Sequence, residues 1–465
     1  MGIFLNYMKP ELMISLIIFL LLILKLGKGM TNAALLPFIQ VLILIGFLIT
    51  LFLPAEGSLF HGMYRTGRLI GFQKAVLLLG VYLISLLCSG WLKKSEHLTE
   101  FIVLMLSALL GMFFLLSSGH LVMFFLSLEL ATIPVAAMSN FDLDKKASSE
   151  AAMKMILSSA FASGILLFGI SLIYGITGTL YFDALVSRIE AGPLQVMAFV
   201  FLFSAFAFKL SVVPFHLWTA DVYEGSPFPV TAFLSVVSKG AVAFTFVSVL
   251  YRVFQPLGEL WHILLMITAV STLVIGNLFA LRQDNIKRFL AFSSIAQVGF
   301  ILVGITANDA SGTASVTYFI LVYLFSNLAA FGVASVIADS TGRENISDYR
   351  GLYASHPMLC WVMALALFSL AGIPPTAGFF GKVFLLGAGA SRGQLWLIVI
   401  AALNMVISLY YYLRVVRAMF MEKQLSPIGT ITQELPVRFA LLLCVAGILL
   451  TGLLSWIYEY IRLLI

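Results

Sequence analysis

Apolar residues along this chain gather into runs separated by short polar breaks, and the pattern repeats from one end to the other. The runs are roughly 20 residues long, the length that crosses about 30 Å of hydrocarbon as an α-helix. They are continuous, as in Phe101 to Leu116 and Phe439 to Leu450, and lack the alternation of a membrane β-barrel strand. Because backbone groups in lipid must be paired within a helix or a closed barrel, the pattern predicts an all-α membrane protein.

Counting the runs predicts about fourteen transmembrane helices. They start near residues 12, 31, 73, 98, 119, 149, 193, 228, 259, 286, 314, 357, 394 and 437. Composition agrees, because 61% of the 465 residues are hydrophobic and 10% are charged, whereas soluble domains carry about 25% charged residues. No connection between the runs is long enough for a soluble domain, so the sequence offers no place to bind NADH or flavin.

Two predicted spans contain internal prolines. The seventh includes Lys209 and Pro214, and the twelfth includes Pro374, Pro375 and Lys382. Proline removes a backbone hydrogen bond, so both helices are expected to break. Each is the fourth helix of a five-helix set, one running from span four to eight and the other from nine to thirteen. An odd number of helices inverts the second set, and paired breaks in inverted repeats point to the ion site of a transporter.

This organisation divides the chain into four parts. Residues 1–97 hold helices one to three, 98–252 the first repeat, 253–425 the inverted second repeat, and 426–465 the last helix. If both termini lie outside, fifteen basic residues fall in cytoplasmic connections and eight outside, as the positive-inside rule favours. The outside set is Lys9, Arg65, Arg68, Lys74, Arg188, Arg252, Arg392 and Arg462. The four basic residues that remain lie within spans: Lys154, Lys209, Lys239 and Lys382.

Ionisable residues near the membrane midplane are the candidate functional groups. Glu129 and Lys239 are central in their spans, and Lys209 and Lys382 adjoin the two breaks. Each such charge costs about 2.5 to 3.5 kcal/mol if isolated, so partners are expected. One interpretation is a fixed ion pair that joins helices. An excess of lysines over carboxylates fits that poorly. Since burial favours the neutral amine, a row of lysines linked by water predicts a proton relay.

Other polar residues leave two interpretations open. Lys154 follows Glu150 by four residues, which fits either a snorkelling surface lysine or a relay member. His216 is either a proton shuttle or a hydrogen-bonded structural histidine. Asp221 and Glu224 are either solvated loop carboxylates or part of a proton funnel at the cytoplasmic mouth.

Metal, cofactor and nucleic-acid binding are not indicated. The three cysteines show no CxxC spacing, and the six histidines include no facing pair in mid-membrane that would bind haem. The net charge of +6 comes from basic residues scattered between apolar runs, so it reflects topology rather than a nucleic-acid surface. A lipid-modifying enzyme would need a catalytic cluster in a loop, and none is found.

Three stretches carry a family resemblance. Residues from Pro214 to Phe233 resemble subunit N of respiratory complex I, the proton-pumping NADH:quinone oxidoreductase, and so do Gln283 to Ser294 and Ile373 to Lys382. Related antiporter-like subunits usually carry a His-Ser-Trp-Leu-Pro-Asp-Ala type of sequence in place of the first stretch. The resemblance covers roughly residues 100 to 425 and implies a fourteen-helix fold with two inverted five-helix repeats.

The resemblance also implies roles for residues at matching positions. They are Glu129 as the charge-gating glutamate, Lys209 as its partner, Lys239 as the central relay, Lys382 as the outlet and Lys154 as the sixth-helix lysine. It implies partners as well: the antiporter-like subunits M and L, the small subunits K, J and A, and the peripheral redox arm, in a bacterial cell inner membrane. NADH, flavin, iron–sulfur clusters and quinone are expected in other subunits. The alternative is a subunit of a multisubunit cation/proton antiporter or a membrane-bound hydrogenase.

Overall fold

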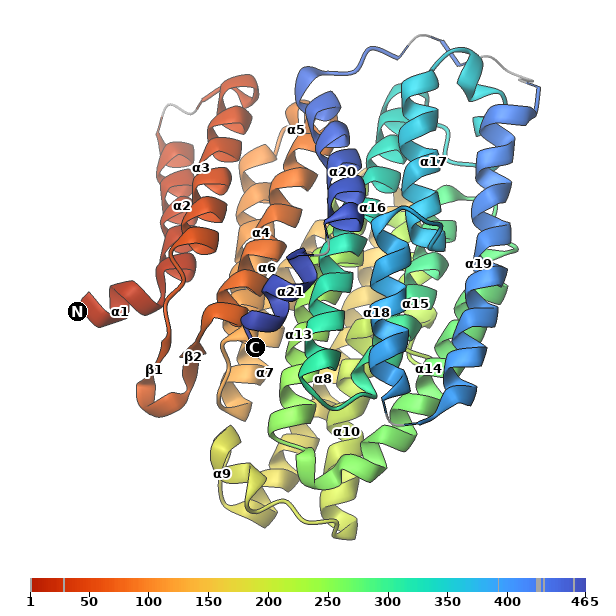
Figure 1. Ribbon diagram of the computed structural model, residues 1–465. Coiled ribbons are helices and arrows are strands. Elements are labelled where there is room, and N and C mark those ends of the chain that lie inside the picture. Colours follow the sequence, from red (N-terminus) through yellow and green to blue (C-terminus); the bar gives the residue numbers. More distant parts are fainter. Residues whose placement is uncertain (1, 28–29, 392, 424–427, 430, 455) are drawn as a thin grey trace.

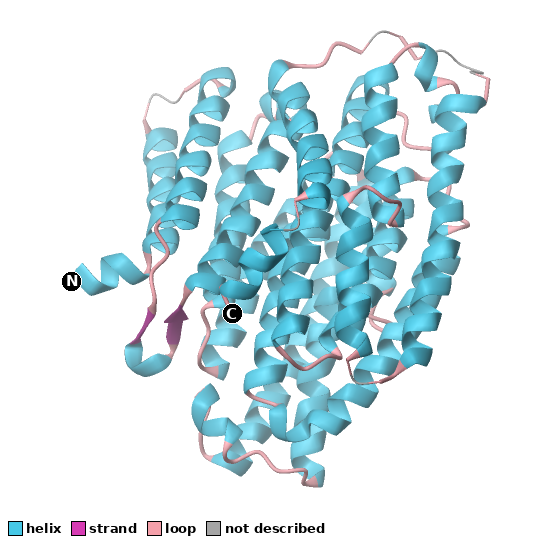
Figure 2. Ribbon diagram, viewed as in Figure 1, coloured by secondary structure: helices cyan, strands magenta, loops and turns pink. Residues whose placement is uncertain are grey.

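The computed structural model describes residues 2–27, 30–391, 393–423, 428–429, 431–454 and 456–465. Apart from one short hairpin, its regular elements are helices that stand side by side (Figure 2). The N-terminal elements are α1 (Gly2–Tyr7), α2 (Lys9–Leu26), α3 (Asn32–Phe52), β1 (Gly57–Leu59), η1 (Phe60–Gly62), β2 (Tyr64–Thr66), α4 (Arg68–Leu87) and α5 (Ser89–Lys94).

The two repeats follow. The first consists of α6 (Leu98–Leu116), α7 (Leu121–Ser139), α8 (Lys146–Thr177), α9 (Phe182–Val186), α10 (Pro193–Leu210), α11 (Leu217–Gly225), α12 (Phe228–Ala232), the π-helical turn η2 (Phe233–Ser238), and α13 (Lys239–Arg252). The second, after η3 (Gln255–Leu257), consists of α14 (Gly258–Ala280), α15 (Ile286–Ile305), α16 (Ala310–Thr341), η4 (Ile346–Tyr349), η5 (Leu352–Ala354), α17 (Pro357–Ala371), α18 (Ala377–Ala390) and α19 (Leu395–Met421). The chain ends with α20 (Leu435–Leu453) and α21 (Trp456–Leu463).

These elements give the fourteen predicted spans. Within the described ranges, twelve helical segments are long and apolar enough to cross a membrane. The other two spans are α2 and the pair of shorter helices α17 and α18. Every predicted helix start lies within five residues of an observed one. The predicted fold class is therefore confirmed.

The bundle has two polar faces. The first, called the hairpin face, carries β1, β2 and α9. An ion pair between Arg65 of β2 and Asp183 of α9 joins the hairpin to α9. That contact lowers the pKa of the Asp183 carboxyl. The loop face carries the connections 141–145, 281–285 and 342–356, and it lies toward the top of Figure 1. Between the two faces, α13, α15 and α16 are buried over nearly their whole length, so their polar side chains are shielded from lipid.

Both proline-containing spans break where predicted. The seventh is interrupted between Leu210 and Leu217, and the twelfth between Ala371 and Ala377. Neighbouring hydroxyl groups satisfy polar groups that the breaks expose. Thr272 Oγ1 accepts from the Val213 N–H at 3.0 Å in the first break, and Ser369 Oγ accepts from the Gly378 N–H at 3.1 Å in the second.

A glycine sets the close packing at the second break. A Cβ atom on Gly378 would lie 1.8 Å from the backbone oxygen of Ser369. Only a residue without a side chain therefore lets the start of α18 pass so close to the end of α17.

One topological assignment from the sequence was wrong. Lys74 was counted with the outside connections, but it lies inside α4 with its side chain fully buried. Its Nζ lies 2.5 Å from Oε1 of Glu11 on α2, which is also fully buried, and it donates to Ser117 Oγ at 2.7 Å. The membrane region therefore contains a second carboxylate and a fifth lysine, both outside the predicted relay. Their contact joins α2 to α4.

Candidate functional site

Lys239 occupies the centre of the bundle. It begins α13 directly after the π-helical turn η2, and such turns often occur at functional sites because they shift the direction of the next side chains. Its side chain is buried, and Nζ donates to Ser294 Oγ of α15 at 2.7 Å. The Tyr223 ring lies 5.6 Å from the same amine. Lys239 thus connects the first repeat to the second.

Lys382 lies at the break in the twelfth span. Its buried Nζ donates to the backbone oxygens of Leu370 at 2.7 Å and Ala371 at 3.1 Å. These carbonyls end α17, where they lack helical partners and carry the negative end of the helix dipole. The Phe300 ring lies 4.5 Å from the amine. The break therefore supplies a site that can hold an ammonium group.

Polar side chains of α15 lie between these two lysines. Ser294 and Gln297 are three residues apart and share one face of the helix. Gln297 Nε2 donates to the Leu370 oxygen at 2.9 Å and to Tyr412 Oη at 3.1 Å. Lys382 and Gln297 thus share the Leu370 oxygen. Polar groups extend from Lys239 to Lys382 through this part of α15.

Lys209 lies one residue before the end of α10. Its Nζ donates to Thr132 Oγ1 of α7 at 2.6 Å and to Ser159 Oγ of α8 at 2.8 Å. A cavity of about 20 Å³ beside it is also lined by Ser159, Trp218 and Ser238. A single water needs roughly 10–15 Å³. The cavity can therefore hold one water between Lys209 and Ser238, the residue before Lys239.

Glu129 does not contact its predicted partner. Among the described residues, no ion pair within 4.0 Å joins Glu129 to Lys209. The Glu129 carboxylate instead accepts a hydrogen bond from Ser163 of α8. Ser159 and Ser163 are one turn apart on α8, so one helix face supplies a hydroxyl to each charged group. Glu129 and Lys209 therefore make no direct contact in this structure, although Thr132, which accepts from Lys209, lies three residues after Glu129 on α7.

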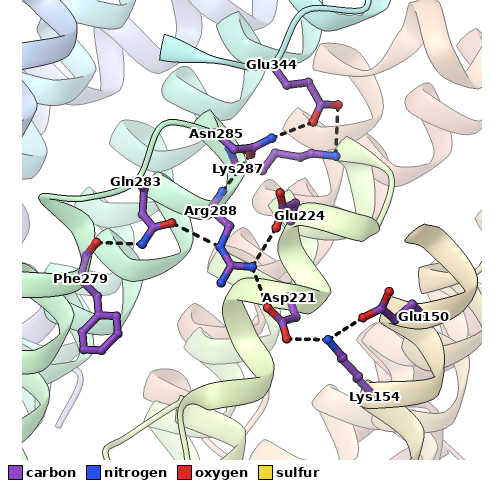
Figure 3. A network of polar contacts seen from close by, with 10 residues as sticks. All are labelled: Glu150, Lys154, Asp221, Glu224, Phe279, Gln283, Asn285, Lys287, Arg288 and Glu344. Atoms are coloured by element: carbon purple, nitrogen blue, oxygen red, sulfur yellow. Dashed lines mark hydrogen bonds and ion pairs between the residues drawn. The ribbon is translucent and has the colours of Figure 1, made fainter. Parts of the chain in front are cut away.

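Lys154 lies in a charged cluster at the loop face rather than in the row formed by Lys209, Lys239 and Lys382. Its Nζ lies 2.7 Å from both Glu150 Oε1 and Asp221 Oδ2, and 42% of its side chain is exposed. Figure 3 shows the cluster continuing from Asp221 to Arg288 of α15. The Arg288 Nη1 contacts Asp221 Oδ1 at 2.7 Å and Glu224 Oε2 at 2.8 Å. Sequence reasoning placed Arg288 in a connection and missed this contact.

His216 precedes α11 at the first break. Its side chain is buried, and within the described part of the chain its Nδ1 has no hydrogen-bond partner. A role as a proton shuttle remains a prediction. The described residues contain no group of three or more His, Cys, Asp or Glu side chains that could hold a metal ion, and Cys88, Cys360 and Cys444 are buried and free.

Comparisons with known proteins agree on one family. The family model described as NADH:quinone oxidoreductase/Mrp antiporter, TM, matches residues 118–408. "NADH-quinone oxidoreductase subunit N" of Phocaeicola vulgatus is 47% identical over 97% of this chain and 97% of its own length. "NAD(P)H-quinone oxidoreductase subunit 2" of Synechocystis is 38% identical over 89% of this chain and 82% of its own.

Solved structures share the fold. A chain of respiratory complex I from Thermus thermophilus with bound aureothin superposes with a TM-score of 0.81 at 29% identity, covering 96% of this chain and 97% of that one. A chain of the Mrp complex from Dietzia superposes with a TM-score of 0.80 at 19% identity, covering 98% and 95%. The latter likeness shows the fold alone.

Proposed function

Because the chain belongs to the subunit N family of NADH-quinone oxidoreductases, we propose that it conducts protons across the membrane while other subunits pass electrons from NADH to quinone. One observation carries this proposal. Three lysines follow one another through the two broken spans and the bundle centre, with hydroxyl, amide and carbonyl groups between them. A structural ion pair does not require such a row.

The proposed relay runs from Lys209 to Lys382. A proton leaves the Lys209 ammonium when Glu129 lies apart from it, since the separated charge loses its stabilising partner. The water-sized cavity passes the proton to neutral Lys239. Ser294 and Gln297 lie along the way to Lys382. The Leu370 and Ala371 oxygens then stabilise the Lys382 ammonium until it releases the proton.

Removing one hydroxyl tests this path. Ser294→Ala deletes the acceptor of Lys239 Nζ, so quinone-coupled NADH oxidation and proton pumping in proteoliposomes are expected to fall together several-fold. Electron transfer from NADH to an artificial acceptor should be unchanged. The matched control is Ser85→Ala, because Ser85 is buried in α4 and its hydroxyl donates to the Tyr82 oxygen of the same helix at 2.7 Å. Equal pumping by both variants would refute the path through α15.

The surroundings follow from the same proposal. We place NADH, flavin, iron–sulfur clusters and quinone in other subunits. The proposed partners are the antiporter-like subunits of the M and L types, the small subunits K, J and A, and the redox arm. The membrane is the bacterial cell inner membrane. Purification of the intact complex should recover this chain together with these subunits.

Orientation is a separate proposal. The excess of basic residues in the loop-face connections favours the cytoplasm for that face. Both chain ends would then lie on the periplasmic side. Reporter tags that are active on one side of the membrane only should place the N-terminus and the C-terminus outside. A cytoplasmic signal from either tag would contradict this topology.

A further inference from the structure

We propose that Arg288 is a positioning residue for a proton-uptake cluster at the loop face, so that the second repeat controls proton uptake by the first. The cluster consists of Glu150, Lys154, Asp221, Glu224 and Arg288 (Figure 3). The inference rests on the proposed function, because it names where the relay takes up its protons.

The cluster carries an uncompensated negative charge. Three carboxylates face one ammonium and one guanidinium, and all five side chains are between 30% and 67% exposed. Charged neighbours from the surrounding elements do not change the balance. They are Lys287 of α15, Glu344 after α16, and Asp142 and Lys145 before α8. The net charge remains minus one, so the cluster can bind one proton without forming an excess of positive charge.

The cluster lies close to the start of the relay. Asp221 follows Trp218 by three residues on α11, about one helical turn. Trp218 lines the water-sized cavity that Lys209 also lines. On α8, Lys154 precedes Ser159 by five residues, about 7.5 Å along the helix axis, and Ser159 accepts a hydrogen bond from Lys209. Two helices thus lead from the cluster to Lys209.

Arg288 is the contact through which the second repeat reaches this cluster. Its Nη1 bonds Asp221 and Glu224 together, while Nε donates to Gln283 at 3.3 Å within its own repeat. The neighbouring Lys287 Nζ donates to the Ser226 oxygen, just after α11, at 3.3 Å. α15 therefore holds the loop-face end of α11. A displacement of α15 would move Asp221 relative to Lys154.

The uptake step is a simple proton exchange. A proton from water at the loop face binds an oxygen of Asp221 or Glu224 and replaces that oxygen's contact with Arg288. The carboxylic acid then gives the proton, through water in the cavity, to the neutral amine of Lys209. The carboxylate that remains pairs again with Arg288, and charge is conserved at both steps.

The test is the pH profile of quinone-coupled turnover in the intact complex. Arg288→Gln takes the net charge of the cluster from minus one to minus two, which strengthens proton binding by the carboxylates. Turnover should fall several-fold because release to Lys209 slows. The alkaline limb should move to higher pH by about 1 unit. Arg288→Lys keeps the charge and should keep the limb near its original pH.

Charge-balanced variants separate electrostatics from structural damage. The double variant Arg288→Gln with Glu224→Gln restores the net charge of the cluster to minus one. The alkaline limb of its pH profile should therefore return toward that of the wild type. Glu224→Gln alone should move it to lower pH, which keeps the proposal testable even if Arg288→Gln does not assemble. The matched control is Arg350→Gln, because Arg350 pairs with Glu422 at 2.8 Å away from the cluster. It should leave the profile unchanged.

Two outcomes would overturn the inference: an unchanged profile in Arg288→Gln or in Glu224→Gln, or an equal shift in Arg350→Gln. Lys209→Arg in the same assay distinguishes this failure from failure of the proposed function. If Lys209→Arg abolishes turnover while the cluster variants keep the wild-type profile, only the uptake site is wrong. If Lys209→Arg pumps normally, the relay itself is wrong.

Discussion

Lys209→Arg is expected to lower quinone-coupled turnover and proton pumping about a hundredfold or more, since a positioned proton-transferring group contributes about 10²- to 10⁴-fold. Arginine keeps the positive charge and offers hydrogen-bond donors to Thr132 and Ser159, the partners of Lys209 Nζ. It does not release its proton in this range. A relay that depends on a neutral amine therefore stops, although the charge remains.

The measurement compares NADH oxidation with quinone and with an artificial electron acceptor in membranes that contain equal amounts of the complex. The artificial acceptor reaction should be unchanged. Lys93→Arg is the matched control, because Lys93 pairs with Glu434 at 2.7 Å away from the row. Normal pumping by Lys209→Arg would show that position 209 needs only a fixed charge.

Lys74→Met is expected to destabilise the chain by about 3–5 kcal/mol, the cost of leaving one partner of a buried ion pair alone. Lys74 and Glu11 are both fully buried, and the second carboxylate oxygen of Glu11 already lacks a partner among the described residues. Without the ammonium, the Glu11 charge has no counterion inside the bundle. Less complex should accumulate, and the purified complex should unfold at a lower temperature.

The double variant Lys74→Met with Glu11→Gln supplies the control. Removing both charges also removes the uncompensated one, so most of the lost stability should return. Thermal unfolding of the purified complex measures both variants. If the double variant were as unstable as the sum of the two single variants, the ion pair would not be the reason for the loss.

Spans and breaks were predictable because their causes are local. A run of about 20 apolar residues determines a crossing whatever surrounds it, and proline interrupts a helix through its own chemistry. This logic gave the break around Pro214 and the break at Pro374 and Pro375. Local rules therefore sufficed for most of the fold.

Contacts between distant helices were not predictable. Lys74 follows the start of its helix by six residues, so it looked like a residue of a connection, and its partner Glu11 is 63 residues away. Arg288 lies 67 residues from Asp221. Glu129 and Lys209 each bond a serine of a third helix, α8, instead of each other. Each of these contacts results from how the helices pack against one another, and the pattern of apolar and polar residues does not predict that packing.

The two serines on one face of α8 have a mechanical consequence. Ser159 holds Lys209 and Ser163 holds Glu129, and both hydroxyls point the same way because they are one turn apart. A rotation of α8 about its axis would withdraw both hydroxyls at once. Glu129 would then lose the hydroxyl of Ser163, and Lys209 would keep only its contact with Thr132 of α7, the helix that also carries Glu129. α8 would thus act as a two-position switch rather than a graded one, with its rotation angle as the variable that determines the state.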